Sequence, residues 1–212
     1  SVRACVAAVN TRLDAIICNA GIMALPELQR AHGYELQFLT NHLGHFILVT
    51  GLLDRLTDEG RVVMLSSDAH RRAPKEGIQF DNLDGSKGYA PWTAYGQSKL
   101  ANLLFARSLA KRLAGTRRTA NALHPGVIMT PLARSLSGAV KSAMALVSPL
   151  VLKTVGEGAA TQTYLATSAA VAGVSGEYFA DCNVSWPSRQ GQDDALAERL
   201  WTETERIVAS LR

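Results

Sequence analysis

The sequence predicts an α/β fold, in which a mostly parallel β-sheet is covered by helices on both faces. Short apolar runs alternate along the 212 residues with longer segments whose apolar residues recur every three or four positions. The short runs are apolar throughout, which is typical of strands buried on both faces. No repeat, low-complexity tract or linker divides the chain, and we therefore expect one domain over residues 1–212.

Four short runs are expected to form the strands of this sheet. They cover residues Leu13–Cys18, 61–67, 119–123 and 176–181. The first run ends in Asn19-Ala20-Gly21 and the third in His124-Pro125-Gly126, both of which favour turns. Because ligands of open parallel sheets bind beyond the carboxyl ends of the strands, these positions are the first candidates for a functional site.

The segments between and after these runs have helical spacing. The start of the chain is typical of a helix interior, and further helices are expected over residues 32–56, 94–113, 158–168 and 193–211. A polar loop rich in Gly, Pro and Asp reaches from the second strand to about Trp92.

Composition and charge exclude several classes of function. The formal net charge is only +4 and the basic residues are scattered, which does not indicate a nucleic-acid surface. Cys5, Cys18 and Cys182 lie far apart without a CxxC pair, so neither a disulfide framework nor a cysteine-rich zinc site is expected. The most apolar run, residues 143–152, is too short to cross a bilayer, and no signal peptide is visible. We therefore predict no nucleic-acid partner, no transmembrane segment and a cytoplasmic location.

Tyr95 and Lys99 stand four residues apart in a predicted helix, so their side chains project from one face. A free tyrosine has a pKa of about 10, too high for ready proton exchange at neutral pH. A nearby lysine ammonium favours the phenolate and lowers that pKa. Such pairs also occur on ordinary helix surfaces, and the surrounding residues must decide between the two interpretations.

Five segments supply that context. They are Asn19-Ala20-Gly21 after the first strand, Asn41 in the next helix, Leu65-Ser66-Ser67 at the second strand end, Tyr95-Gly96-Gln97-Ser98-Lys99, and Pro125-Gly126-Val127-Ile128-Met129-Thr130. In this order and context they resemble the short-chain dehydrogenase/reductase family over nearly the whole chain. The segments 41–46, 65–70 and 98–102 are most similar to its retinol dehydrogenase-like branch, which includes WW-domain oxidoreductase. The resemblance implies a Rossmann-type doubly wound parallel sheet.

The resemblance implies an NAD(P)-dependent oxidoreductase that interconverts an alcohol and a carbonyl. Tyr95 would be the acid/base that exchanges a proton with the substrate oxygen. Lys99 would lower the pKa of Tyr95 and bind the nicotinamide ribose. Ser67, rather than Ser66, would hold the substrate oxygen, and Asn41 would hold a water that connects Lys99 to solvent.

The cofactor implied by the resemblance is NADP or NAD, with NADP slightly favoured. Besides Tyr95 and Lys99, the residues implied to bind it are Asn19, Ala20 and Gly21 on the adenosine side and Pro125, Gly126, Val127, Ile128 and Thr130 over the nicotinamide. The apolar segment 131–154, where family members cap the substrate pocket, favours a small lipophilic substrate, although ordinary helix packing also explains it. A homo-oligomer is left open.

Family members begin with a strand, a Gly-rich turn and a helix that bind the cofactor pyrophosphate, and this sequence shows none of them. We therefore expect the chain to be the C-terminal part of a Rossmann fold and to be inactive alone. The alternative is a non-catalytic nucleotide-binding or scaffold relative on the same fold.

Two other site types are disfavoured by the sequence. A metal site built on Glu35, His42 and His45 conflicts with their expected role in helix packing. A serine hydrolase is disfavoured because residues 96–100 lack the final Gly of the nucleophile turn and lie inside a helix. His70 and His124 are expected to be structural.

Overall fold

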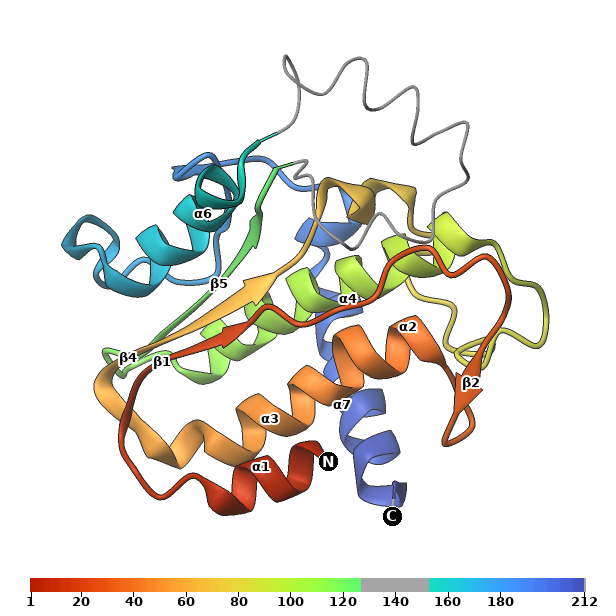
Figure 1. Cartoon of the computed structure of the whole chain (residues 1–212), viewed down its shortest axis with the longest axis horizontal. Coiled ribbons are helices and arrows are strands. Elements are labelled where there is room, and N and C mark those ends of the chain that lie inside the picture. The colour runs from red at the N-terminus through yellow and green to blue at the C-terminus, as the bar shows by residue number, and fades with distance from the viewer. Residues whose placement is uncertain (127–152, 212) are drawn as a thin grey trace.

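The computed structural model describes residues 1–126 and 153–211 (Figure 1). Its larger sheet has the strand order β1-β4-β5-β6-β7. The strands are β1 (Leu13–Cys18), β4 (Leu56–Leu65), β5 (Thr119–His124), β6 (Tyr178–Ala180) and β7 (Asn183–Val184). The first four run parallel and β7 is antiparallel to β6, so the predicted parallel α/β sheet is confirmed. A separate hairpin joins β2 (Arg30–Ala31) to β3 (Tyr34–Glu35).

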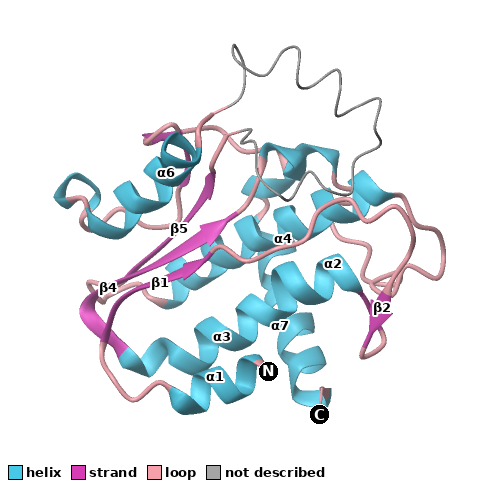
Figure 2. Ribbon diagram, viewed as in Figure 1, coloured by secondary structure: helices cyan, strands magenta, loops and turns pink. Residues whose placement is uncertain are grey.

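Helices cover both faces of this sheet, as predicted (Figure 2). The α-helices are α1 (Val2–Ala8), α2 (Leu36–Phe38), α3 (Gly44–Leu52), α4 (Pro91–Arg112), α6 (Val155–Thr167) and α7 (Asp194–Ser210). Shorter helical turns are η1 (Leu39–Leu43), η2 (Leu53–Arg55), η3 (Asp68–Arg72), η5 (Ala169–Val171) and η6 (Gln190–Gln192). On one face α3 and α4 pack against the strands, with α1 on α3 and α7 on α4, while α6 packs on the other face.

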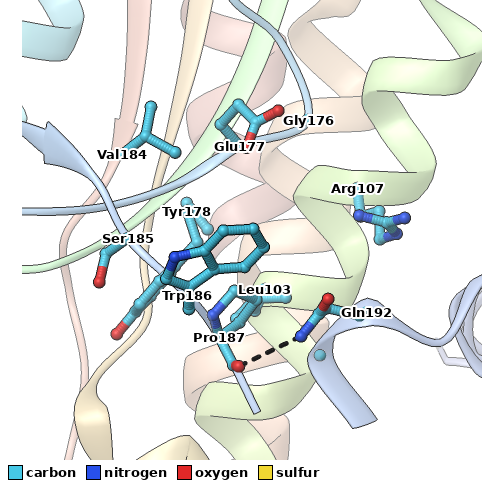
Figure 3. Close-up of a pocket in the computed structure, with 12 residues that line it drawn as sticks. Leu103, Arg107, Gly176, Glu177, Tyr178, Val184, Ser185, Trp186, Pro187 and Gln192 are labelled. Atoms are coloured by element: carbon cyan, nitrogen blue, oxygen red, sulfur yellow. Dashed lines mark hydrogen bonds between the residues drawn. The ribbon is translucent and has the colours of Figure 1, made fainter. Parts of the chain in front are cut away.

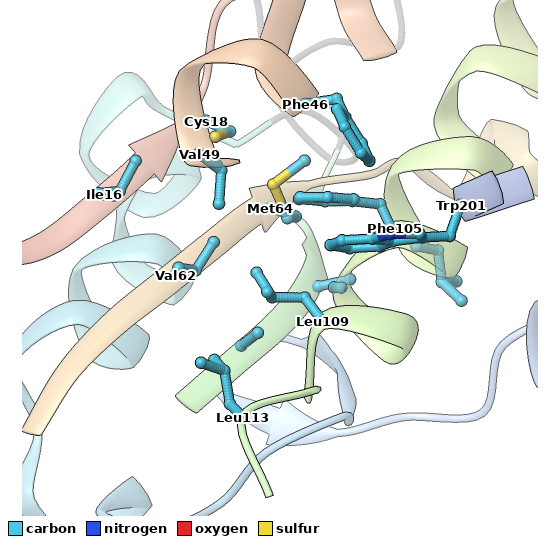
Figure 4. Packing of buried hydrophobic residues seen from close by; sticks show 14 of the residues in the cluster. Ile16, Cys18, Phe46, Val49, Val62, Met64, Phe105, Leu109, Leu113 and Trp201 are labelled. Atoms are coloured by element: carbon cyan, nitrogen blue, oxygen red, sulfur yellow. The ribbon is translucent and has the colours of Figure 1, made fainter. Parts of the chain in front are cut away.

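The core has a layer on each side of β4. Val62 and Met64 face α3 and α4, where they pack with Phe46 and other buried residues (Figure 4). Their neighbours Val63 and Leu65 face the opposite way, into the smaller layer that includes residues of α6. A strand that buries alternate residues on both faces explains why its sequence is apolar throughout.

Several element boundaries differ from those expected. The helix expected from residue 32 begins only at Leu36, because His32 and Gly33 have φ values of +52° and +83° and form the tight turn between β2 and β3. The Glu35 carboxylate then caps the helix by accepting hydrogen bonds from the backbone N–H groups of Gln37 and Phe38. Strand β4 begins at Leu56 rather than residue 61, across an irregularity in its pairing with β1.

Strand β7 was not expected from the sequence. It follows β6 through Asp181 and Cys182, which have φ values of +50° and +61°. Such turns usually carry Gly or Asn, so these two residues gave no turn signal. None of the helices in the part of the chain described combines the length and apolarity required to cross a membrane.

Candidate active site

Three of the residues that the sequence singles out meet beside the end of β4. Tyr95 and Lys99 lie on α4 and are 6% and 5% exposed, while half-buried Ser67 is the second residue after β4. The side chain of Ser67 lies close enough to the Tyr95 hydroxyl to influence its pKa. The ammonium nitrogen of Lys99 lies 5.7 Å from the centroid of the Tyr95 ring. The helical spacing of four residues thus places a hydroxyl pair and a cation at one point.

Burial controls the protonation of this cluster. It raises the pKa of Tyr95 above its ordinary value, and the Ser67 side chain opposes that rise. The lowering of this pKa expected from Lys99 is therefore not seen, because burial of the phenol dominates. Burial also lowers the pKa of Lys99 to about 8, and it raises the pKa of the neighbouring Cys18 thiol to about 12. At neutral pH the cluster therefore holds a protonated phenol, a mostly protonated amine and an uncharged thiol.

The two serines after β4 have different partners. Ser66 is 2% exposed and its hydroxyl donates a 2.7 Å hydrogen bond to the backbone carbonyl of Lys99. Lys99 Nζ in turn donates a 3.1 Å hydrogen bond to the backbone carbonyl of Leu65. Asn102 Nδ2 donates to the same carbonyl. Ser66 thus fastens β4 to α4, whereas Ser67 is the serine that reaches Tyr95.

Asn41 is fully buried inside a wide helical turn. Residues Leu39–Leu43 form a π-helical turn, in which the N–H of Gly44 donates to the carbonyl of Leu39. The Asn41 side chain accepts from the N–H of Ile22 and donates to its carbonyl, both at 2.9 Å, and also donates to Ser98 Oγ at 2.9 Å. Turns of this kind frequently occur at functional sites. Here the turn links the loop after β1 to α4.

The loop after β1 passes directly beside this cluster. A Cβ atom at Gly21 would lie 3.0 Å from Asn41 Oδ1 and 3.5 Å from Lys99 Nζ. Asn19 and Ala20 are exposed. The missing side chain at Gly21 therefore leaves room next to the Lys99 ammonium, which uses one of its three N–H groups on a backbone carbonyl. These features fit a ribose-bearing cofactor.

The segment after β5 is described only in part. Pro125 and Gly126 are half-buried, and Gly126 has a φ of +90° with the Lys153 side chain against it. Val127, Ile128 and Thr130 lie outside the described residues.

One feature of the site was missed by sequence reasoning. Gln37 Oε1 accepts a 2.6 Å hydrogen bond from the N–H of Ala24, a residue with φ of +46°. Gln37 Nε2 donates to the hydroxyl of Tyr89, which donates to the carbonyl of Leu25 at 2.6 Å. This clamp fixes the loop that carries Gly21. The available signal was the spacing of Gln37 and Asn41, which stand four residues apart and so share a helix face.

The histidines have structural partners. His42 Nε2 is 3.0 Å from Thr204 Oγ1 of α7, and burial lowers the pKa of His42 to about 3 and that of His45 to about 4.

The other two buried or half-buried histidines connect loops. His70 Nδ1–H donates to the carbonyl of Ser67 at 2.6 Å, while its Nε2 accepts from the N–H of Ser188. His124 Nδ1 accepts from the N–H of Asp68. Within residues 1–126 and 153–211, no three potential metal-ligating side chains gather.

A cavity of about 180 Å³ lies elsewhere, between α4 and the β6–β7 strands (Figure 3). Its lining includes Leu103, Arg107, Tyr178, Trp186 and Gln192. The lining residues in the described part of the chain include none of the predicted site residues.

The chain is similar to known proteins over most of its length. The model of the short chain dehydrogenase family matches residues 1–141. The chain is 42% identical over 213 residues to the short-chain dehydrogenase TIC 32 B, chloroplastic, of Brassica napus, covering 96% of this chain and 66% of the relative. It is also 42% identical over 205 residues to retinol dehydrogenase 14 of Homo sapiens, covering 95% of this chain and 60% of that protein. The chain thus spans less than two thirds of the length of either relative.

A solved structure has a similar fold and sequence. The crystal structure of an uncharacterised protein from Mycobacterium paratuberculosis superposes with a TM-score of 0.76 at 35% identity, covering 99% of this chain and 71% of that chain. The family is one of oxidoreductases that bind NAD(P). The chain belongs to the short-chain dehydrogenase family, in its retinol dehydrogenase-like branch.

Proposed function

We propose that the protein catalyses the NAD(P)-dependent interconversion of an alcohol and a carbonyl, with Tyr95 as its acid/base. The observation that supports this most directly is the contact of Tyr95 with Ser67, beside the buried ammonium of Lys99. A phenol, a second hydroxyl and a cation at one point can bind a carbonyl oxygen, protonate it and stabilise the phenolate that remains.

The four side chains have different roles in carbonyl reduction. Tyr95 Oη donates its proton to the substrate oxygen, which the Ser67 hydroxyl holds by a hydrogen bond. The raised pKa of Tyr95 keeps the phenol protonated until this step. Lys99 stabilises the resulting phenolate, and a water held by Asn41 returns the proton from solvent through Lys99. In alcohol oxidation the same groups move the proton in the opposite direction.

The cofactor is NADP or NAD, and when bound it supplies or accepts the hydride. Lys99 would hold the nicotinamide ribose with its remaining N–H groups. Asn19, Ala20 and Gly21 would border the adenosine side, and 125–128 with Thr130 would cover the nicotinamide. The preference for NADP follows from the family resemblance.

The substrate proposed is a small lipophilic alcohol or carbonyl compound. It is supported by the apolar segment 131–154 and by the retinol dehydrogenases among the relatives. Homo-oligomer formation stays open. The cytoplasmic location also stays a prediction, since one relative is chloroplastic by name.

Substitution of Tyr95 by Phe, in a protein that also carries the Gly-rich cofactor-binding segment expected before residue 1, tests the proposed chemistry. It removes the transferable proton and keeps the ring, so turnover of an aldehyde with NADPH should fall by about 10²–10⁴-fold. Tyr164→Phe is the matched control, because Tyr164 lies on α6, across the sheet from α4. Near-normal turnover in Tyr95→Phe would contradict the role of Tyr95. A wild-type protein that binds NADPH yet reduces no carbonyl would indicate the non-catalytic relative instead.

A further inference from the structure

The side chains of Trp92 and Arg72 stack beside Tyr95. The Trp92 ring lies 6.1 Å from the Tyr95 ring, centroid to centroid, with an angle of 80° between the planes. The guanidinium carbon of Arg72 lies 4.9 Å from the centroid of the indole. Trp92 is 38% exposed, while Tyr95 is only 6% exposed. The indole is therefore the more accessible aromatic surface next to the proposed acid/base.

The backbone brings this pair to the same point as the reacting groups. Arg72 ends η3, which begins directly after Ser67, and Trp92 lies in the first turn of α4, three residues before Tyr95 (Figure 1). The two elements touch at Gly96, where a Cβ would lie 2.6 Å from the carbonyl oxygen of Ala69. Arg72 and Trp92 are thus carried by the same two backbone segments that carry Ser67 and Tyr95.

The partners of the pair favour an ordered indole. Arg71 forms an ion pair with Asp68 at 2.8 Å, whereas the guanidinium of Arg72 lies over Trp92. A cation stacked on one aromatic face is attracted by the ring and restrains it. The Tyr95 ring restrains the indole from another side. Such a rigid, half-open aromatic surface is a common component of small-molecule sites.

We propose that Trp92 contacts the substrate and determines specificity, selecting carbonyl compounds whose reacting carbon bears a flat aromatic or conjugated group. Arg72 acts as a positioning residue that holds the indole. The proposal rests on the proposed function, because it places the carbonyl at Tyr95 and Ser67. A flat conjugated group stacks against an indole more favourably than a saturated chain does, so the preference is one of shape and electron distribution.

The kinetic test uses two aldehydes, 2-naphthaldehyde (flat) and octanal (saturated), with NADPH and a purified protein that also carries the expected cofactor-binding segment. The quantity compared is the ratio of kcat/KM for 2-naphthaldehyde to that for octanal. Trp92→Ala should lower this ratio about tenfold, Trp92→Phe should restore most of it, and Arg72→Gln should lower it by a smaller factor. Trp186→Phe removes another exposed tryptophan, which is 81% exposed, and should leave the ratio unchanged.

A binding test keeps the outcome separate from the proposed chemistry. 2-Naphthaldehyde absorbs near the emission of tryptophan, so its binding should quench the protein fluorescence and yield a dissociation constant. Trp92→Ala should raise that constant about tenfold, while Trp186→Phe should leave it unchanged. If both aldehydes are reduced but Trp92→Ala leaves the ratio unchanged, the inference is wrong and the proposed function stands. If no aldehyde is reduced even with the cofactor-binding segment present, the proposed function fails, and the dissociation constant of Trp92→Ala alone decides whether Trp92 contacts the ligand.

Discussion

The adjacent residues Ser66 and Ser67 allow stability and turnover to be separated at the scale of single side chains. Ser67→Ala should lower turnover strongly, since Ser67 lies beside Tyr95, and it should lower the free energy of unfolding by about 1 kcal/mol, because Ser67 Oγ also caps η3 at the N–H of Ala69. Ser66→Ala should lower the free energy of unfolding by a similar amount, about 1 kcal/mol, through the lost hydrogen bond to Lys99, and should reduce turnover much less. Steady-state kinetics and urea denaturation of both variants measure this. The opposite pattern would assign the substrate contact to Ser66.

The lowered pKa of Lys99 predicts an alkaline limit to activity. Because burial brings this pKa to about 8, the ammonium loses its proton as the pH rises above that value. The kcat/KM for the dinucleotide, which reports on the free enzyme, should therefore fall above about pH 8. Arginine stays charged, so the residual activity of Lys99→Arg should show no such fall. A fall that persists unchanged in Lys99→Arg would assign it to another group.

The meeting of Ser67, Tyr95 and Lys99 was implied by the family resemblance, and the strand-end rule for parallel sheets accounts for the place of Ser67. The sequence did not reveal that the carbonyl of Leu65 is the acceptor for Lys99. Backbone groups look alike in every sequence, and only the path of the chain shows which carbonyl points at the amine. The roles of these side chains stay predictions.

At the scale of elements, Gly96 determines how closely α4 approaches η3. A Cβ there would lie 2.6 Å from the carbonyl oxygen of Ala69 and 2.9 Å from the amide nitrogen of Ala73, both backbone atoms. Gly96→Ala should therefore lower the free energy of unfolding by about 1–3 kcal/mol, and it should also lower turnover by shifting Tyr95 relative to Ser67. Denaturation midpoints and aldehyde reduction measure the two effects.

Gly156 on α6 provides the matched control. The nearest atom to a Cβ at that position is Thr154 Oγ1 at 4.0 Å, so the added methyl meets no obstacle. Gly156→Ala should be neutral or raise the free energy of unfolding by up to about 1 kcal/mol, since alanine favours the helix. Equal losses of stability in the two variants would contradict a close backbone contact at Gly96.

The elements were predicted best where burial alone determines them. Strand β1 has the expected bounds, because a short apolar run between polar turns is typical of a buried strand. The turn and second strand of the β2–β3 hairpin fall inside the helix expected from residue 32, because the turn at His32 and Gly33 is marked by only one glycine. Short-range signals are weak where a positive φ falls on a residue other than Gly or Asn.

For the whole molecule, His42 and His45 predict loss of stability in acid. Unfolded histidine takes up a proton below about pH 6.5. In the folded protein burial lowers these pKa values to about 3 and about 4, so the unfolded state binds more protons as the pH falls. Between pH 6.5 and 5, each histidine should lower the free energy of unfolding by about 2 kcal/mol.

Urea denaturation at pH 7 and pH 5 measures this difference. His42→Gln and His45→Gln should each show a smaller change between the two pH values than the unaltered protein. His32→Gln is the control, because His32 is exposed and its replacement should leave the change as it was. An undiminished pH dependence in both of the first two variants would assign the acid sensitivity to other groups.

The layered architecture followed from the apolar strands and amphipathic helices, but its edges did not. At one edge β1 pairs only with β4 among the described strands, and Ile17 on it is 44% exposed. At the other edge, β7 turns back antiparallel to β6. The strands at the edges of a sheet are determined by short segments and by turn geometry, and the periodicity of apolar residues does not predict either.

The π-helical turn at Leu39–Leu43 has a consequence for changes in chain length. It holds one more residue than an ordinary helical turn, and each residue advances an α-helix by about 100°. Deletion of Thr40 could therefore be accommodated as a regular α-helical turn, with α3 still packed on the sheet. Asn41 would then point away from Ile22 and Ser98. Among homologous proteins, a gap of one residue at this position should mark those that have kept the helix and lost the proton path.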